Sequence, residues 1–294
     1  SIATNRLPGL TFGIYIFLLH SSLFIAQFLI NLAPLDDIGL FVLISILVSL
    51  ALLPLTLANK PAPGYEAPET LPLKKLITSS QFALVSVFAS GFCAGTVVGI
   101  GVVYADELGQ SKSWAAGLMA SYILGSALIP LVIGTISDRF DRRKVIITIA
   151  LCALLTSLAF HLSTHTFILM FLFGGLVTSI YSVGLAYMND HVTQEQAVSA
   201  STSLILINGM GAMLGPLVSG LIMDYISINA FFYGFSVVLA ALFFFGIYRA
   251  YAGDKIIVED QGEFVHVPTR TSPEILQILD EDTNESPSEE KTTQ

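Results

Sequence analysis

The sequence predicts an all-α, polytopic membrane protein with eight transmembrane helices, and three observations support this fold class. First, the 294-residue chain is 54% hydrophobic and only 12% charged, whereas soluble domains carry about 25% charged residues. Second, its apolar residues form runs near the ~20 residues that cross a bilayer as a helix, without the alternation of barrel strands. Third, its basic residues fall between these runs and almost all on one side.

Eight apolar runs define the predicted spans. The first exceeds the apolar core of a signal peptide and lacks a basic flank before a cleavage site, so we interpret it as a spanning helix. The fifth and the last are the shortest. The predicted spans are Leu10–Leu32, Ile38–Leu57, Phe82–Tyr104, Trp114–Ile136, Val145–Leu162, Phe167–Met188, Val198–Met223 and Phe231–Tyr248.

The basic residues predict the orientation of the chain. Only Lys112 falls on one side of the predicted membrane, and the positive-inside rule makes the other, basic side cytoplasmic. We therefore expect a multi-pass protein of the cell membrane with both termini of the chain in the cytoplasm. The cations on the basic side are Arg6, Lys60, Lys74, Lys75, Arg139, Arg142, Arg143, Lys144, Arg249, Lys255, Arg270 and Lys291.

Composition divides the chain into four parts. Residues 1–57 hold two helices and residues 82–250 hold six. Between them, residues 58–81 are rich in proline, which favours extended chain and predicts a cytoplasmic linker between two helical bundles. Residues 251–294 contain 11 acidic and 3 basic residues and account for most of the net charge of −9. High charge with few aromatic residues predicts a largely disordered cytoplasmic tail.

A cluster of charges lies between the fourth and fifth runs. Residues 134–144 read GTISDRFDRRK, and each arginine in hydrocarbon would cost at least about 2.5–3.5 kcal/mol. The segment therefore forms a short aqueous hairpin. A glycine, three residues, an acid, a base and then paired bases also make up a pattern that resembles the loop signature of the major facilitator superfamily. The plainer alternative is a cytoplasmic hairpin that only marks topology.

The resemblance implies a partial fold. Transporters of this superfamily have twelve helices in two six-helix halves joined by a long cytoplasmic loop, and residues 1–250 are similar to helices 5–12 of that plan. This implies the last two helices of the N-terminal half plus the six-helix C-terminal half, with helices 1–4 missing. The segment from Phe264 to Pro273 resembles the tail of YcaD-like bacterial transporters.

The resemblance also implies a gate in the charged hairpin, which begins at Gly134. Asp138 would face the positive amino end of a helix in the opposite half, and Arg139 and Arg142 would bridge to acids at neighbouring helix ends, with Asp190 the first candidate. Such a network would form when the halves close on the cytoplasmic side. The superfamily has glycine where this chain has Asp141, an extra charge expected to compete with Asp138. The arginines of the predicted gate are Arg139, Arg142 and Arg143.

Four residues of the seventh run predict close helix packing. Gly211, Gly215 and Gly220 are small residues near one another in the sequence, a pattern that lets two helix backbones approach. Pro216 removes one intrahelical hydrogen bond and permits a bend. Antiporters of the superfamily carry a Gly-Pro pattern in helix 5, whereas here it stands in the eleventh position, so the motif does not identify an antiporter.

Polar residues inside spans are candidates for a substrate cavity, because hydrocarbon cannot satisfy them. His20, Gln27 and Asn31 are spaced to share one face of a helix, and Tyr122 and Asn208 lie in later spans. His20 could exchange a proton or make a hydrogen bond across a helix interface. Asn208 could reach substrate or cross-link two helices.

The expected function is secondary active transport of a small solute by alternating access. Export is preferred over uptake because the cavity candidates are apolar, aromatic or uncharged. A non-transporting scaffold or sensor that acts through the acidic tail is the alternative. We expect no enzymatic activity, cofactor, metal or nucleic-acid partner, since the sequence has no catalytic or metal-binding pattern and few bases. The expected partners are the bilayer, a small-molecule substrate and the missing helices 1–4.

Overall fold

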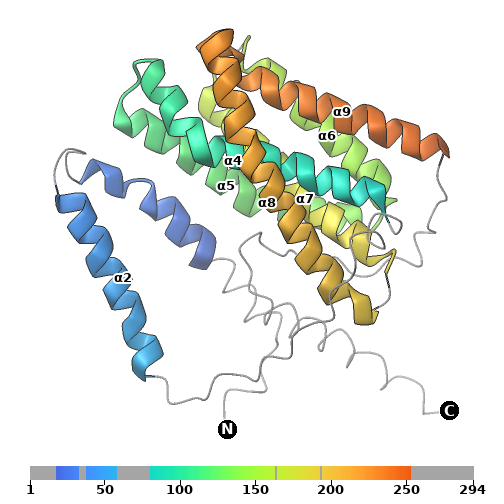
Figure 1. The fold of residues 1–294 in the computed structure, drawn as a ribbon, viewed down its shortest axis with the longest axis horizontal. Coiled ribbons are helices and arrows are strands. Elements are labelled where there is room, and N and C mark those ends of the chain that lie inside the picture. Colours follow the sequence, from blue (N-terminus) through green and yellow to red (C-terminus); the bar gives the residue numbers. More distant parts are fainter. Residues whose placement is uncertain (1–17, 33–37, 58–79, 163, 193, 253–294) are drawn as a thin grey trace.

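The computed structural model describes residues 18–32, 38–57, 80–162, 164–192 and 194–252 (Figure 1). Every regular element among them is helical. The predicted linker and acidic tail, and the start of the first predicted span, lie outside the described residues.

Six helices form the main body. Their bounds are α4 (Gln81–Glu107), α5 (Lys112–Ser137), α6 (Arg142–Ala159), α7 (Thr166–Asn189), α8 (Gln194–Tyr225) and α9 (Phe231–Ala252), with the 3-10 helix η2 (Ile228–Ala230) before α9. Five of them contain one of the last six predicted apolar runs in full, whereas α6 ends at Ala159, three residues before the predicted end of its run. We therefore find these runs as helices, several of which extend further into the flanking polar residues.

Serine caps set the starts of the first two helices of this bundle. The Ser80 side chain accepts a hydrogen bond from the Ala83 amide at 3.2 Å, and that of Ser111 accepts one from the Trp114 amide at 3.2 Å. Such caps satisfy amide groups that have no partner in the first turn of a helix. Gly109 has a φ of 68°, a left-handed conformation that suits glycine just after a helix end. Together these residues make the tight turn between α4 and α5.

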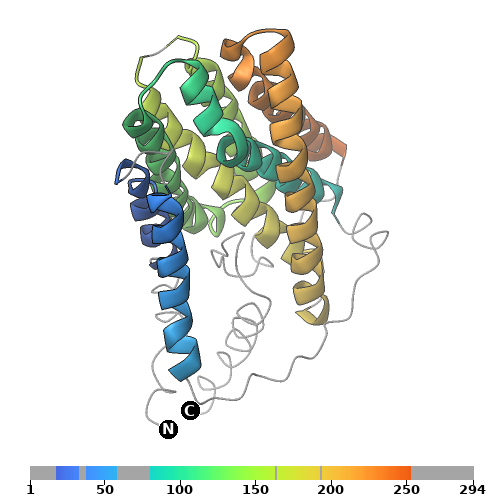
Figure 2. The same cartoon turned by 60° about the vertical axis from the view of Figure 1, so that its left-hand side comes forward.

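The bundle is built around two long helix pairs. The most extensive contacts join α5 to α7 and α4 to α8, and α6 packs on α7 and α9. Figures 1 and 2 show α8 crossing α4. Large side chains fill the centre, among them Phe173 and Tyr181 of α7 and Phe235 of α9. Helices α4, α5, α7 and α8 thus pack against one another, and α6 and α9 pack against each other beside α7.

Small residues let α4 and α8 approach closely. A Cβ atom added at Gly211 or Gly215 would overlap the backbone of α4 near Phe92, and one added at Gly95 would overlap the backbone of Ala212. Gly220 differs from the expectation, because nothing in the described chain lies within 4 Å of the position of its added Cβ.

The α4 side of this interface was not predicted. Gly91, Gly95 and Gly99 follow one another at four-residue intervals and all face α8, where Gly99 lies against Pro216. Four-residue spacing of small residues is the signal that could have found them.

The first predicted span departs from a single helix. Residues 18–26 are helical, but the Gln27 amide bonds to the Phe24 carbonyl at 3.3 Å and the Phe28 amide to the Ile25 carbonyl at 3.0 Å, which are three-residue steps. A 3-10 helix, η1 (Leu29–Asn31), follows. The expectation of one continuous helix to Leu32 is therefore wrong at its end.

The second predicted span forms α2 (Gly39–Leu57). This helix stands apart from the six-helix bundle in both views (Figures 1 and 2), and most of its described side chains are exposed apolar groups. In a bilayer such side chains would contact lipid or further helices.

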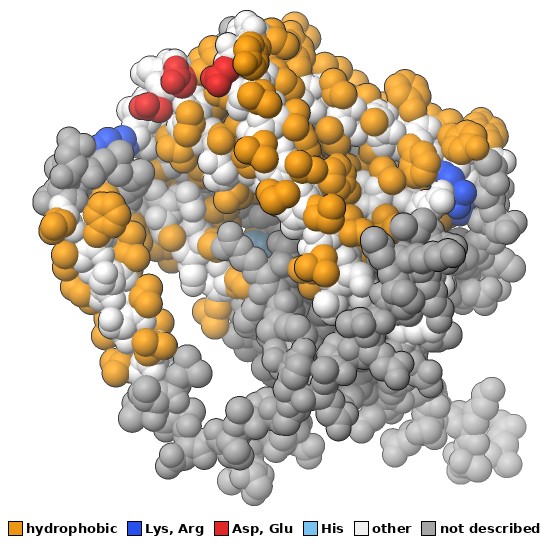
Figure 3. All heavy atoms as spheres, in the orientation of Figure 1, with side chains coloured by type: hydrophobic (Ala, Val, Ile, Leu, Met, Phe, Trp, Pro, Cys, Tyr) orange, Lys and Arg blue, Asp and Glu red, His pale blue; other side chains and the backbone are white. Residues whose placement is uncertain are grey.

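Five helices among the described residues are long and apolar enough to cross a membrane: Gln81–Glu107, Lys112–Ser137, Thr166–Asn189, Ser199–Tyr225 and Phe231–Tyr251. The 18-residue helix α6 begins with three cations, which shortens its apolar part. The protein is thus a multi-pass membrane protein, and the count of eight spans stays a prediction. Apolar side chains dominate the face seen in Figure 3, where charged groups are few.

Candidate functional site

The charged hairpin connects α5 to α6 at one end of the bundle. Asp138 follows α5 and its amide bonds to the Gly134 carbonyl at 3.1 Å. Asp141 precedes α6 and its carboxylate accepts a hydrogen bond from the Arg143 amide at 2.9 Å. Asp141 is thus the N-cap of α6. We expected Asp141 to compete with Asp138 for arginine, but its carboxylate caps the helix instead.

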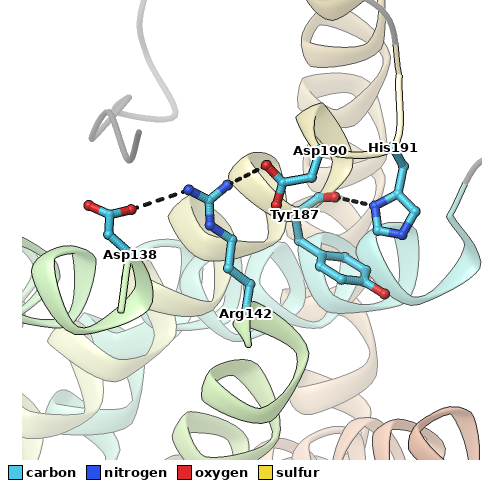
Figure 4. Close-up of polar contacts among 5 residues, drawn as sticks. All are labelled: Asp138, Arg142, Tyr187, Asp190 and His191. Carbon is cyan, nitrogen blue, oxygen red and sulfur yellow. Dashed lines mark hydrogen bonds and ion pairs between the residues drawn. The ribbon is translucent and has the colours of Figure 1, made fainter. Parts of the chain in front are cut away.

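Arg142 lies between two carboxylates (Figure 4). Its Nη1 donates to Oδ1 of Asp190 at 2.8 Å, and its Nη2 donates to Oδ1 of Asp138 at 3.2 Å. Asp138 belongs to the end of α5 and Asp190 to the end of α7. One guanidinium group therefore ties together the ends of α5, α6 and α7, and we call Asp138, Arg142 and Asp190 the carboxylate–arginine network.

The two ion pairs differ in their exposure to solvent. The side chains of Arg142 and Asp190 are 1% and 3% exposed, whereas that of Asp138 is 34% exposed. Charge-assisted hydrogen bonds are short and strong, and removal of one partner from a buried pair leaves a charge that is costly to keep out of water. The pair with Asp190 is therefore the structural part of the network, and the pair with Asp138 is the more adjustable part.

The network lies within one bundle. We expected the network to form when the two halves of a transporter close, and we expected both Arg139 and Arg142 to bridge to acids. Among the described residues, both ion pairs belong to Arg142, and Arg139 is exposed. Helix α6 directs Arg142 inward, whereas Arg139 belongs to the solvent-exposed turn before that helix.

Arg143 makes a second connection, with a residue that the sequence analysis missed. Its Nη2 and Nε donate to the hydroxyl of Tyr187 at 2.8 and 3.1 Å, and its Nη1 donates to the carbonyl of Arg249 at 3.2 Å. Arg143 is 5% exposed. It joins α6 to α7 and to the end of α9. Tyr187 stands three residues before Asp190, one helical turn away, and this spacing is the signal that could have found it.

His191 follows at the same end of the bundle. The Tyr187 carbonyl accepts a hydrogen bond from its Nδ1 at 2.6 Å (Figure 4), so the ring carries its proton on Nδ1 when neutral. Burial lowers the pKa of His191, the Tyr187 carbonyl opposes this shift, and the nearby guanidinium groups of Arg143 and Arg249 lower the pKa further. Burial and the two neighbouring arginines therefore both favour the neutral form of His191.

Two of the predicted cavity residues lie in helix interfaces. The Nδ2 of Asn208 donates to the Val87 carbonyl at 3.1 Å, which cross-links α8 to α4. Of the two roles considered for Asn208, the structure therefore shows the cross-link. Tyr122 is 5% exposed and approaches Gly174 of α7.

The other three cavity candidates belong to the first described segment. His20 lies in the helix over residues 18–26 and is partly buried. The Nε2 of Gln27 donates to the Leu23 carbonyl at 3.2 Å, and Asn31 accepts a hydrogen bond from Ser113 at 2.9 Å. Because the helix ends before Gln27, the three side chains do not share one face of a continuous α-helix.

Known proteins resemble this chain over most of its described length. The family model of the Major Facilitator Superfamily matches residues 83–276, which covers the six-helix bundle except for the first two residues of α4. The chloramphenicol resistance protein CraA of Acinetobacter baumannii is 29% identical over 160 residues, which are 53% of this chain and 38% of that protein.

YcaD-type proteins match a longer part of the chain. The uncharacterized MFS-type transporters YcaD of Escherichia fergusonii and of Shigella flexneri are 25% and 24% identical, and each alignment covers 78% of this chain and 60% of the relative. The chain thus spans less than two thirds of the length of these relatives. The expected resemblance to the YcaD-like branch is confirmed. On the match to its family model, this chain belongs to the Major Facilitator Superfamily.

Proposed function

We propose that this chain is the C-terminal portion, helices 5–12, of a secondary transporter that moves a small solute across the cell membrane by alternating access. The family of the chain supports membrane transport, and its partial coverage of longer relatives supports the assignment to a portion of a transporter. In this scheme α4–α9 form the C-terminal half, and residues 18–57 belong to the N-terminal half. Substrate binds between the halves near the middle of the membrane.

The carboxylate–arginine network is the observation that supports a gating role for the charged hairpin. It joins three helix ends with one buried guanidinium, so α5, α6 and α7 can move as one rigid unit at this end. The partly exposed Asp138 carboxylate remains available to a positively polarised helix terminus of the other half, as the superfamily resemblance suggested. In this proposal Arg142 positions Asp138, and Asp138 forms the contact between halves on the cytoplasmic side.

Export is the preferred direction. The name of CraA describes chloramphenicol resistance, and efflux is one route to resistance. The sequence supports the same direction, because the candidate cavity side chains carry no fixed charge and suit a neutral or lipophilic solute. We propose chloramphenicol as the first probe compound on this basis.

Uptake and export can be separated in proteoliposomes. The full-length protein that contains this chain would be reconstituted, and flux of labelled chloramphenicol measured in both directions against empty liposomes. We expect flux that saturates with substrate and slows in Asp138→Asn at normal expression. A protein with Lys144→Gln, an exposed cation of the same hairpin, is the matched control and should keep the parental rate.

A negative result also has a defined meaning. If no flux is found with a panel of neutral drugs and metabolites, and deletion of residues 253–294 removes binding of a cytoplasmic partner, the protein is a membrane scaffold or sensor. If Asp138→Asn transports at the parental rate, the gating role of the hairpin is refuted while transport itself stands.

A further inference from the structure

We propose that the hydrogen bond between Asn31 and Ser113 is the contact that closes this transporter at the end opposite to the carboxylate–arginine network. This inference rests on the proposed function, because it assigns the two residues to different halves of an alternating-access transporter. It adds a named pair of gating residues to that function, and neither residue belongs to a superfamily motif in the sequence.

The pair joins two distant parts of the chain. The Ser113 hydroxyl donates to Oδ1 of Asn31 at 2.9 Å, across 82 positions of sequence. Asn31 is the last residue of η1, which packs against α5, and Ser113 is the second residue of α5. The bond therefore connects the segment that precedes the linker with the bundle that follows it.

The pair lies at the other end of the membrane span from Arg142. Helix α5 begins at Lys112 and ends at Ser137, and its 26 residues correspond to about 39 Å at 1.5 Å per residue. This exceeds the hydrocarbon thickness of about 30 Å. Asn31 and Asp138 are thus held by opposite ends of one helix that crosses the membrane.

The local chain conformation explains how Asn31 reaches α5. The α-helical hydrogen bonds stop after residue 26, and the three-residue steps of the turn and η1 follow. The departure from a continuous helix places Asn31 beside the first turn of α5. Without it, Asn31 would continue the helical stripe that the sequence predicted.

The chemistry of the pair suits a contact that forms and breaks in each cycle. Both groups are neutral and exposed, so water can replace each partner at small cost. The carboxylate–arginine network joins helix ends within one bundle, so it can persist whichever end of the transporter is open. A reversible contact between bundles is needed at this end, and Asn31 with Ser113 supplies it.

Spin-label distances test the contact without any knowledge of the substrate. Labels on Leu32→Cys and Ser227→Cys, in full-length protein lacking Cys93 and Cys152, would report the separation of η1 from the α8–η2 turn in nanodiscs. We expect two distance populations, and Ser113→Ala should reduce the shorter one relative to the longer by about two- to twelvefold, the factor for the net free energy of one hydrogen bond. Labels on Lys112→Cys and Ser227→Cys, both within the bundle, should give one distance in either background. A single distance for the first pair, or no change with Ser113→Ala, overturns the proposal.

Cross-linking then tests whether the contact must open for transport. Asn31→Cys with Ser113→Cys should react with a short bifunctional thiol reagent, whereas Asn31→Cys with Ser227→Cys should not. Flux should stop in the cross-linked protein and return after cleavage of a reducible linker. Failure to cross-link, or flux at the parental rate after cross-linking, overturns the proposal. If the parent shows no flux with any probe, the proposed function fails, and the spin-label distances still decide whether this contact opens and closes.

Discussion

At the scale of single residues, the difference in exposure between Asp138 and Asp190 gives two similar aspartates different tasks. Both accept a hydrogen bond from Arg142, but Asp190 shares the buried environment of the guanidinium and Asp138 faces partly outward. A buried charge needs its partner far more than an exposed one does. Asp190 therefore maintains the fold at this end, and the partly exposed Asp138 is the carboxylate to which we assign the proposed contact with the other half.

This division predicts a ranking of two substitutions. Asp190→Asn should lower the free energy of unfolding by about 2–4 kcal/mol, since Arg142 loses its buried counter-charge, whereas Asp138→Asn should lower it by about 0.5–1 kcal/mol. Thermal unfolding of detergent-solubilised protein would measure both. Flux should show the opposite sensitivity among variants that remain folded, with Asp138→Asn slow despite near-normal stability. Equal losses of stability would contradict the assignment.

His191 predicts a dependence of stability on pH. Because the folded protein lowers the pKa of His191 below its ordinary value of about 6.5, the unfolded chain binds the proton more readily. Stability from the neutral ring is present above pH 6.5 and decreases as the pH falls below that value. The unfolding temperature should therefore drop between pH 7.5 and 5.5, and by less in His191→Gln.

His161→Gln is the control for this measurement. His161 lies in the loop that connects the other ends of α6 and α7, where it stacks on Tyr233 at a ring-centroid distance of 4.3 Å. A drop of the same size in the parent and in His191→Gln would exclude His191 as its source.

At the scale of elements, apolar length predicted the helices better than it predicted their contacts. The six runs after the predicted linker form helices, the fifth run only as far as Ala159, because a lipid-exposed chain must satisfy its backbone groups internally. The end of the first span was wrong, since an apolar run does not reveal a change from four-residue to three-residue hydrogen bonds. The glycines of α4 were also not predicted, because their role in close packing depends on which helix lies opposite them.

The α4–α8 interface predicts a contrast between two glycines. Gly95→Ala should lower the free energy of unfolding by about 1–3 kcal/mol, because the new methyl group overlaps the backbone of Ala212 and forces the helices apart. Gly220→Ala has open space and should be neutral or stabilising by up to about 1 kcal/mol, the helix propensity of alanine over glycine. Denaturant titration of both variants would measure this. Loss of stability only at Gly220 would mean that the close packing of α4 and α8 does not exist in the membrane.

The candidate site was predictable in composition and less so in arrangement. The motif indicated Asp138, Arg142 and Asp190 as a group, and the structure brings these three together. It could not indicate that Asp141 caps α6 or that Arg143 pairs with Tyr187, because these contacts depend on where α6 begins and on how α7 packs against it. Helix capping and helix packing depend on local geometry, which a charge pattern in the sequence does not predict.

At the scale of the whole molecule, contacts made by two arginines join the charged helix ends at one end of the bundle. Arg142 reaches the end of α7, and Arg143 reaches Tyr187 and the end of α9. Arg139 and Lys144 belong to the same hairpin, whereas Lys112 begins α5 at the opposite end. The described part of the chain thus shows the charge asymmetry on which the predicted orientation rests, and the cytoplasmic location of the basic end stays a prediction of the positive-inside rule.

This orientation predicts how two cysteine variants react with a membrane-impermeant maleimide. In cells that express the full-length protein without its native cysteines, Lys112→Cys should be labelled from outside, and Lys144→Cys only after the membrane is permeabilised. Both positions are exposed, so burial would not explain a difference, and each variant removes one cation. External labelling of Lys144→Cys would mean that the protein has the opposite orientation in the membrane. The carboxylate–arginine network would then lie at the external end and the Asn31–Ser113 contact at the cytoplasmic end, which exchanges the two sides without altering which helices each contact joins.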